Sequence, residues 1–165
     1  MRCQPASRAE RLAFDFESDA ELDHFFWSCH TLFERSTQHA SRGRYSLRVK
    51  LYPSRYPGIS PSFRIRNWSS YKTLHFDVFN PAPSTLTLYL RIDDAYSSPA
   101  YEDRYNGTLR LQPGLNRLSI ALDTLETSGT KRTLDPLSIK RFALFLNHPR
   151  EETTLYFDNF RFLSR

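Results

Sequence analysis

Residues 85–94, TLTLYLRIDD, alternate strictly between hydrophobic side chains and polar or aromatic ones. Because successive side chains of an extended chain point to opposite faces, this period of two predicts a strand with one buried face. We expect the buried face to comprise Leu86, Leu88, Leu90 and Ile92. The opposite face then carries Thr87, Tyr89, Arg91 and Asp93. An aromatic ring, a guanidinium and a carboxylate in one row predict a ligand-binding surface on that face.

Short segments of this kind, separated by turn signals, run through most of the chain. The 165 residues include 10 prolines, 15% of the residues are aromatic, and no helical period extends beyond one or two turns. Strands are predicted at residues 12–17, 32–37, 45–51, 63–67, 73–80, 85–93, 108–112, 116–122, 139–146 and 154–163. Residues 52–61 contain three prolines, which predict a long loop rather than a central strand. The pattern predicts an all-β fold, an antiparallel β-sandwich of two packed sheets with few or no helices.

The length suits one domain that is large enough to bury a core without disulfides or metals. We place a single domain at residues 11–165, preceded by a flexible N-terminal segment at residues 1–10. No apolar run approaches the roughly 18 residues of a membrane helix, so no transmembrane segment is expected in this chain. Cys3 and Cys29 have neither CxxC nor metal-ligand spacing, and we expect free thiols, with a disulfide between them as the alternative.

The net charge of +5 is concentrated in residues 35–66, which hold eight basic residues and no acidic one. The other 15 basic residues are outnumbered by 18 acidic ones, so the rest of the chain is net negative. This segment could bind an anionic polymer through Arg48, Lys50, Arg64 and Arg66. These residues alternate with hydrophobic ones, so we favour a solvated sheet face over that alternative. No recognition motif accompanies the basic residues, and nucleic acid is not expected as a partner.

Sequence signatures of catalysis are missing from the chain. The five histidines show no HxxxH or HExxH spacing, and no GxSxG nucleophile elbow occurs. A glycosidase needs two carboxyl groups that face each other across ~5–10 Å, and adjacent acids on a strand point apart. Asp93 with Asp103 could supply such a pair. Without an activated nucleophile or base beside them, we do not expect an enzyme.

Six segments, spread over nearly the whole chain, carry a resemblance to a known family when they are taken together. They are FDFE (14–17), SRGRYSLRV (41–49), WSSYKTLHFDVFN (68–80), LTLYLRIDD (86–94), QPGLN (112–116) and LYFDNFRF (155–162). In this order they resemble jelly-roll carbohydrate-binding modules of the galactose-binding-domain-like type. The resemblance implies a non-catalytic accessory domain that binds a glycan on its concave sheet face or in loops at one edge. It also implies a location outside the cytoplasm, as part of a larger secreted or membrane protein.

Carried over to this sequence, the resemblance implies a glycan-binding groove on the polar face of residues 85–94. Its residues would be Tyr89, Arg91, Asp93, Arg104, Tyr105, Asn106 and Asn147, joined by Asp77, Phe79 and Phe145 on neighbouring strands. Sugar rings would stack on the aromatic side chains, and the polar groups would bind hydroxyls. Trp27 and Trp68 are expected at structural positions outside this groove.

The resemblance also implies a structural calcium ion between the first and last strands. Its ligands would be Glu17, Asp158 and backbone carbonyls of residues 41–46. Calcium takes six to eight oxygen ligands and tolerates irregular geometry, so such a set is chemically reasonable. In the alternative, Glu17 lies in solvent and Asp158 caps a bulge in the last strand.

A structural interpretation of the polar row stays open beside the glycan site. Arg91, Asp93, Asp103 and Arg104 could form an ion-pair network that fixes the loop after residue 93 onto the sheet. The sandwich would then be a structural or protein-interaction domain that binds no sugar, because a fold by itself does not fix a function.

Overall fold

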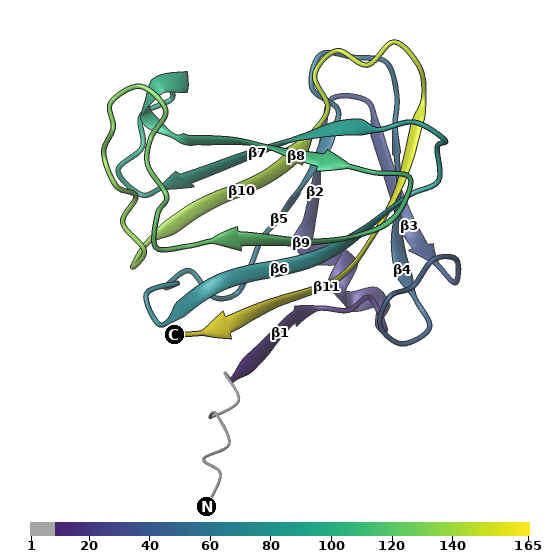
Figure 1. The fold of residues 1–165 in the computed structure, drawn as a ribbon, viewed down its shortest axis with the longest axis horizontal. Coiled ribbons are helices and arrows are strands. Elements are labelled where there is room, and N and C mark those ends of the chain that lie inside the picture. Colours follow the sequence, from purple (N-terminus) through teal and green to yellow (C-terminus); the bar gives the residue numbers. More distant parts are fainter. Residues whose placement is uncertain (1–8) are drawn as a thin grey trace, which may run out of the picture.

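The computed structural model describes residues 9–165. In it, the chain folds into two antiparallel sheets that pack face to face (Figure 1). Sheet A contains, in order, β3 (Thr31–Ser36), β4 (Ser46–Leu51), β11 (Thr153–Ser164), β6 (Tyr71–Asn80) and β9 (Gly114–Ala121), and β1 (Glu10–Phe14) also pairs with β11. Sheet B contains, in order, β2 (Phe25–Ser28), β5 (Gly58–Pro61), β10 (Ile139–Phe145), β7 (Leu86–Asp94) and β8 (Tyr105–Leu111). Two 3-10 turns, η1 (Asp19–His24) and η2 (Tyr101–Asp103), are the helical elements of the described residues. The predicted all-β antiparallel sandwich is confirmed.

The core lies between the sheets and is built on aromatic rings. The alternation predicted for β7 is present, since Leu88, Leu90 and Ile92 are each no more than 2% exposed. Phe160 on β11 lies in the middle of the aromatic cluster, with its ring stacked on that of Phe76 at a centroid distance of 4.9 Å. Its other ring neighbours, at centroid distances of 6.2–6.5 Å, are Phe14, Phe16, Phe25, Phe63 and Phe157. Burial of these rings holds the two sheets together.

Sheet B contains two strands that the sequence patterns did not predict, β2 and β5. The predicted loop at residues 52–61 contains β5, which pairs with β2 on one side and β10 on the other. Its four residues fit between Pro57 and the terminal Pro61, so the prolines lie at the strand ends, where a missing N–H is tolerated. The strand predicted at residues 63–67 does not form, and this segment instead places Phe63 in the core.

Strand β11 pairs with two different strands along one of its edges. Its first half pairs with β4 and its second half pairs with β1, in which Glu10 lies opposite Leu163. The change of partner coincides with an irregular register between Asp158 and Arg161, where Asn159 has a left-handed φ of 56°. The flexible segment predicted at residues 1–10 falls mostly outside the described residues, and Glu10 already belongs to β1.

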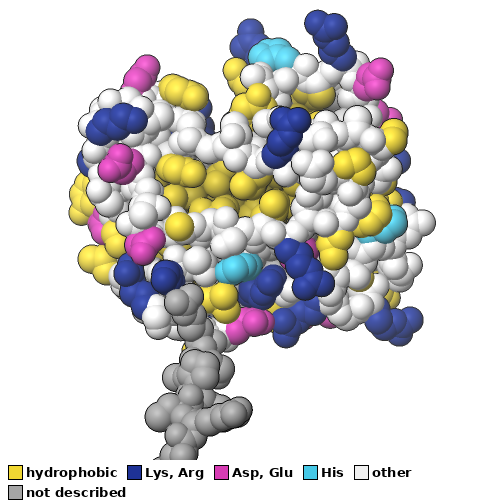
Figure 2. Space-filling model, viewed as in Figure 1, with side chains coloured by type: hydrophobic (Ala, Val, Ile, Leu, Met, Phe, Trp, Pro, Cys, Tyr) yellow, Lys and Arg dark blue, Asp and Glu magenta, His cyan; other side chains and the backbone are white. Residues whose placement is uncertain are grey.

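The core reaches the surface between the edge strands of the two sheets. Figure 2 shows hydrophobic side chains gathered between β8 and β9, where Leu109 and Leu118 pack against the core while remaining partly exposed. Within residues 9–165, no helix has the length and hydrophobicity needed to cross a membrane. Cys29 is an exposed free thiol, whereas Cys3 lies outside the described residues.

Candidate functional site

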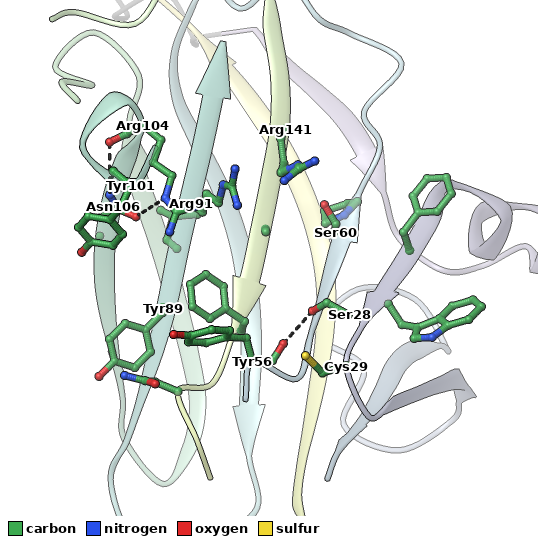
Figure 3. A pocket seen from close by; sticks show the side chains of 18 of the residues that line it. Ser28, Cys29, Tyr56, Ser60, Tyr89, Arg91, Tyr101, Arg104, Asn106 and Arg141 are labelled. Atoms are coloured by element: carbon green, nitrogen blue, oxygen red, sulfur yellow. Dashed lines mark hydrogen bonds between the residues drawn. The ribbon is translucent and has the colours of Figure 1, made fainter. Parts of the chain in front are cut away.

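The outer face of sheet B, turned away from the core, is hollowed by a cleft of about 920 Å³. Strands β5, β10, β7 and β8 form its floor, β2 forms one wall, and η2 with the residues after it forms the other (Figure 3). Side chains on one face of paired strands line up in rungs, so the register decides which groups meet. Tyr89 lies opposite Phe145, and Arg91 lies opposite both Ala143 and Asn106. The small side chain of Ala143 leaves the middle of the floor open.

One half of the cleft is aromatic. The rings of Tyr89 and Phe145 lie 5.9 Å apart and 22° from parallel, and Tyr56 meets Phe145 edge-on at 5.8 Å. The Ser28 hydroxyl donates a 2.9 Å hydrogen bond to the carbonyl oxygen of Tyr56, which ties this residue to β2. In the β2 wall, Trp27 is 66% exposed. These rings offer flat apolar surfaces to a ligand.

The other half of the cleft carries guanidinium groups (Figure 3). Arg91 donates hydrogen bonds of 2.8 and 2.7 Å to the two carboxylate oxygens of the buried Asp93. Arg104 donates a 3.0 Å hydrogen bond to the side-chain oxygen of Asn106 and lies 4.9 Å from the centre of the Tyr101 ring. Burial, and next the charge of Arg91, lowers the pKa of Arg104, which still stays protonated because arginine is so strong a base.

A bulge in β10 brings two further cations into the cleft. The register of β10 against β7 shifts between Ile139 and Arg141. A bulge adds a residue to one strand and re-aims its side chains, so the sequence neighbours Lys140 and Arg141 both line the cleft. Neither forms an ion pair with another residue in the described part of the chain.

Two ion pairs of Arg132, one of them with the buried Asp94, hold the η2 wall of the cleft in place. Asp94 is fully buried and accepts hydrogen bonds of 2.6 and 3.1 Å from Arg132 and of 2.8 Å from the Asp135 amide. Arg132 also contacts Asp103 of η2 at 3.3 Å. Burial acts to raise the pKa of Asp94, but its hydrogen bonds outweigh burial and hold that pKa at about 2. Arg132 therefore connects the end of β7, the β9–β10 connection and η2.

The ion-pair network considered for the polar row exists, with one different partner. Arg91 binds Asp93 as expected, whereas Asp103 pairs with Arg132 and not with Arg104. The loop after β7 is thus fixed without engaging Arg104 in an ion pair. A structural network and the cleft lining therefore coexist on this face.

The structure brings most of the predicted ligand residues together in the cleft. Five of the seven line it, namely Tyr89, Arg91, Arg104, Asn106 and Asn147. Asp93 does not, because Arg91 binds both of its carboxylate oxygens and its side chain is only 8% exposed. Tyr105 points to the opposite side of β8 and packs against the core, since side chains alternate along the strand.

Other expectations about the groove need correction. Asp77 and Phe79 lie on β6 of sheet A, so they cannot join a cleft on sheet B. Trp68 is buried as predicted, but Trp27 lies exposed in the cleft wall. The lining residues that sequence patterns missed include Trp27, Tyr56, Tyr101, Lys140 and Arg141. They lie on a four-residue strand, in a loop, in the 3-10 turn η2 or at a bulge, where hydrophobic periodicity gives no signal.

The two residues named for calcium, Glu17 and Asp158, hold the turn at residues 41–46 through its amide groups. Glu17 accepts hydrogen bonds of 2.6 and 2.9 Å from two successive backbone N–H groups late in the turn. Asp158 accepts bonds of 2.8 and 2.9 Å from two N–H groups at its start. Calcium needs oxygen ligands where these donors stand, so the turn as arranged does not fit the ion. Within residues 9–165, no group of three or more His, Cys, Asp or Glu side chains is placed to hold a metal ion.

Thermal unfolding tests whether calcium binds at this site. An ion that binds only the native state raises its stability, so a chelator would lower the melting temperature. Because the turn offers N–H donors, we expect the Tm in calcium and in EDTA to agree within about 1 °C. A rise of several degrees in calcium that Asp158→Asn abolishes would show that the turn rearranges to bind the ion.

Solved structures resemble this chain in fold but not in sequence. No protein-family model and no curated protein matches it. The family 11 carbohydrate-binding module from Clostridium thermocellum, in complex with a β-1,3-1,4-mixed-linked tetrasaccharide, matches with a TM-score of 0.69 at 13% identity, over 97% of this chain and 98% of that one. The CBM22-1 xylan-binding domain from Paenibacillus barcinonensis Xyn10C matches with a TM-score of 0.60 at 14% identity, over 97% of this chain and 99% of that one.

An exo-β-agarase structure also matches, with a TM-score of 0.71 and 16% identity over 93% of this chain. This chain spans only 25% of that protein, so the likeness concerns one part of it. At these identities the shared property is the arrangement of strands. The chain therefore has the jelly-roll β-sandwich fold of carbohydrate-binding modules.

Proposed function

We propose that this chain is a non-catalytic accessory domain that binds a glycan in the cleft on sheet B. The observation that carries the proposal is the cleft itself, in which Tyr89, Phe145 and Trp27 present rings beside hydrogen-bonding side chains. Sugars have apolar C–H faces and polar hydroxyl edges, which suit flat aromatic surfaces flanked by polar groups. Two structural neighbours of similar length support it, one solved with a mixed-linked tetrasaccharide and one a xylan-binding domain.

The composition of the cleft supports a non-catalytic role. A glycosidase needs two carboxyl groups that face each other across ~5–10 Å. The lining of the cleft within residues 9–165 includes no Asp or Glu. Asp93 and Asp103, the pair considered from the sequence, are bound to Arg91 and Arg132 respectively. We also propose that this domain is part of a larger protein outside the cytoplasm. A polysaccharide as the proposed ligand supports this, as does the structural similarity to a carbohydrate-binding module of a cellulosomal cellulase.

Substitution of Tyr89 tests the proposal. Tyr89→Ala removes one ring of the aromatic half, and we expect glycan affinity to fall at least about tenfold, or about 1.4 kcal/mol. Tyr96→Ala is the matched control, because Tyr96 is 72% exposed on the loop after β7 and lies outside the cleft. Affinity electrophoresis against mixed-linked β-glucan, xylan and agarose, followed by calorimetry, compares the two variants. Equal affinity of Tyr89→Ala and wild type would remove this cleft as the site.

The anionic-polymer alternative through residues 35–66 gains no support from the fold. Arg48 lies on β4 of sheet A and is paired with Glu34. Arg64 and Arg66 lie in the segment after β5 of sheet B, so the four cations chosen from the sequence do not share one sheet. A domain that binds only protein partners would show no affinity for any glycan in the electrophoresis panel.

A further inference from the structure

The cleft carries an excess of positive charge. Four basic side chains line it, Arg91, Arg104, Lys140 and Arg141, and none of its described lining residues is acidic. Asp93 neutralises Arg91 through two hydrogen bonds. The other three take part in no ion pair within residues 9–165, so three positive charges remain available to a ligand.

These charges converge on one part of the cleft. Figure 3 shows Arg91, Arg104 and Arg141 projecting from neighbouring parts of sheet B into the same half, away from Tyr89 and Tyr56. Burial, and next the charge of Arg91, lowers the pKa of Arg104, and the charge of Arg141 adds to the effect. Like charges held this close repel each other, and together they attract any anion that enters the cleft.

Guanidinium groups suit anionic substituents better than hydroxyls. A guanidinium offers parallel N–H donors that match a carboxylate or a sulfate ester, and charge-assisted bonds are about twice as strong as neutral ones. Arg104 is already oriented by its hydrogen bond to Asn106 and by its position over the Tyr101 ring. A neutral sugar would leave the repulsion among these cations uncompensated, whereas an anionic one would relieve it.

We propose that the cleft binds an acidic glycan, with a uronate carboxylate or a sulfate ester between Arg104 and Arg141 and a neighbouring sugar ring on Tyr89 and Phe145. This inference rests on the proposed function and names its ligand class. Tyr89 and Arg91 are two residues apart on β7, or about 7 Å along a strand, so one chain of sugars reaches both halves. Carboxylate and sulfate share the recognising chemistry, and the experiment separates them.

Matched pairs of polysaccharides test the inference by calorimetry. Polygalacturonate is compared with its fully methyl-esterified form, and a sulfated galactan is compared with the same galactan after desulfation. We expect wild type to bind an acidic member at least about tenfold more tightly than its neutral counterpart. That affinity should weaken as the salt concentration is raised, because salt screens exposed charges.

The variant Arg141→Gln tests whether the preference for acidic over neutral polysaccharides comes from the cleft. Arg141 is exposed and makes no ion pair in the described chain, so its loss leaves the fold intact. We expect affinity for the acidic member to fall about tenfold, so that most of its preference over the neutral member is lost. Arg117→Gln on β9 of sheet A removes the same charge outside the cleft and should keep wild-type affinity.

Three results would overturn the inference, and they differ in what else they reject. Equal affinity for acidic and neutral members, with Tyr89→Ala still defective, rejects the acidic ligand and keeps the glycan-binding function. Equal losses in Arg117→Gln and Arg141→Gln assign the attraction to the overall charge of the domain. Failure to bind any polysaccharide rejects both the inference and the proposed function.

Discussion

Arg132→Met is expected to lower the free energy of unfolding at pH 7 by about 3 kcal/mol, because breaking a buried ion pair leaves an uncompensated charge. The substitution leaves the carboxylate of Asp94 fully buried without its guanidinium partner. The Asp135 amide and the Ser97 hydroxyl still donate to Asp94, which limits the loss. The η2 wall also loses its contact through Asp103, so glycan affinity should fall together with stability.

The effect of Arg132→Met depends on pH in a direction set by the pKa of Asp94. That pKa is about 2 in the folded protein, against 3.8 for an unperturbed aspartate. The stabilisation is therefore fully present above about pH 4 and is lost as the pH falls towards 2. Urea unfolding of wild type and variant across this range should show the difference shrinking in acid. Lys131→Met removes a neighbouring exposed charge, and an equal loss of stability in that control would contradict the role given to Arg132.

Phe160→Ala should cost about 3–5 kcal/mol, the range for removing a large ring from a packed core. The ring is fully buried and stacks on Phe76. Five other phenylalanine rings from both sheets and their connections surround it, so the cavity cannot close without moving several elements. Urea unfolding at neutral pH measures the loss as a lower midpoint.

Phe26→Ala provides the matched control for this core substitution. Phe26 is the same residue type, but it is 57% exposed in the β2 wall of the cleft. Exposed substitutions usually change stability by less than about 0.5 kcal/mol, and we expect that here. Similar losses in the two variants would mean that the core is not organised around Phe160.

Long strands could be predicted from the sequence because burial of one face imposes a period of two. Strand β7 shows this plainly, with buried residues at Leu88, Leu90 and Ile92 and cleft residues at Tyr89 and Arg91 between them. The same alternation predicted that a ligand surface would lie on this face. The polar and aromatic residues of β7 therefore indicated which face of the strand is turned away from the core, before its partner strands were known.

Short or irregular elements could not be predicted in the same way. Strands β2 and β5 have four residues each, too few for a period to stand out. The bulge that turns both Lys140 and Arg141 towards the cleft depends on pairing with β7, which local sequence does not encode. The ion pair of Asp94 with Arg132 joins residues 38 positions apart, and no local pattern links them.

Which polar side chains form ion pairs and which stay unpaired likewise could not be predicted from the sequence. Arg91 and Asp93 share one face of β7, so their pairing was geometrically available. Whether Asp103 would bind Arg104 or Arg132 depended on where the β9–β10 connection lies. In the structure this connection places Arg132 against Asp94 and Asp103. Arg104 therefore forms no ion pair with Asp103 and lines the cleft instead.

The shared strand β11 sets how the domain responds to mechanical load. Glu10 and Leu163 lie opposite each other at one end of the β1–β11 ladder. A pull between the chain segments that continue from these two residues loads the hydrogen bonds one rung at a time. Peeling of this kind takes less force than sliding strands past each other, which strains all rungs together. Under tension we therefore expect the first break at this end of β11, in sheet A, while the strands that carry the cleft lie in sheet B.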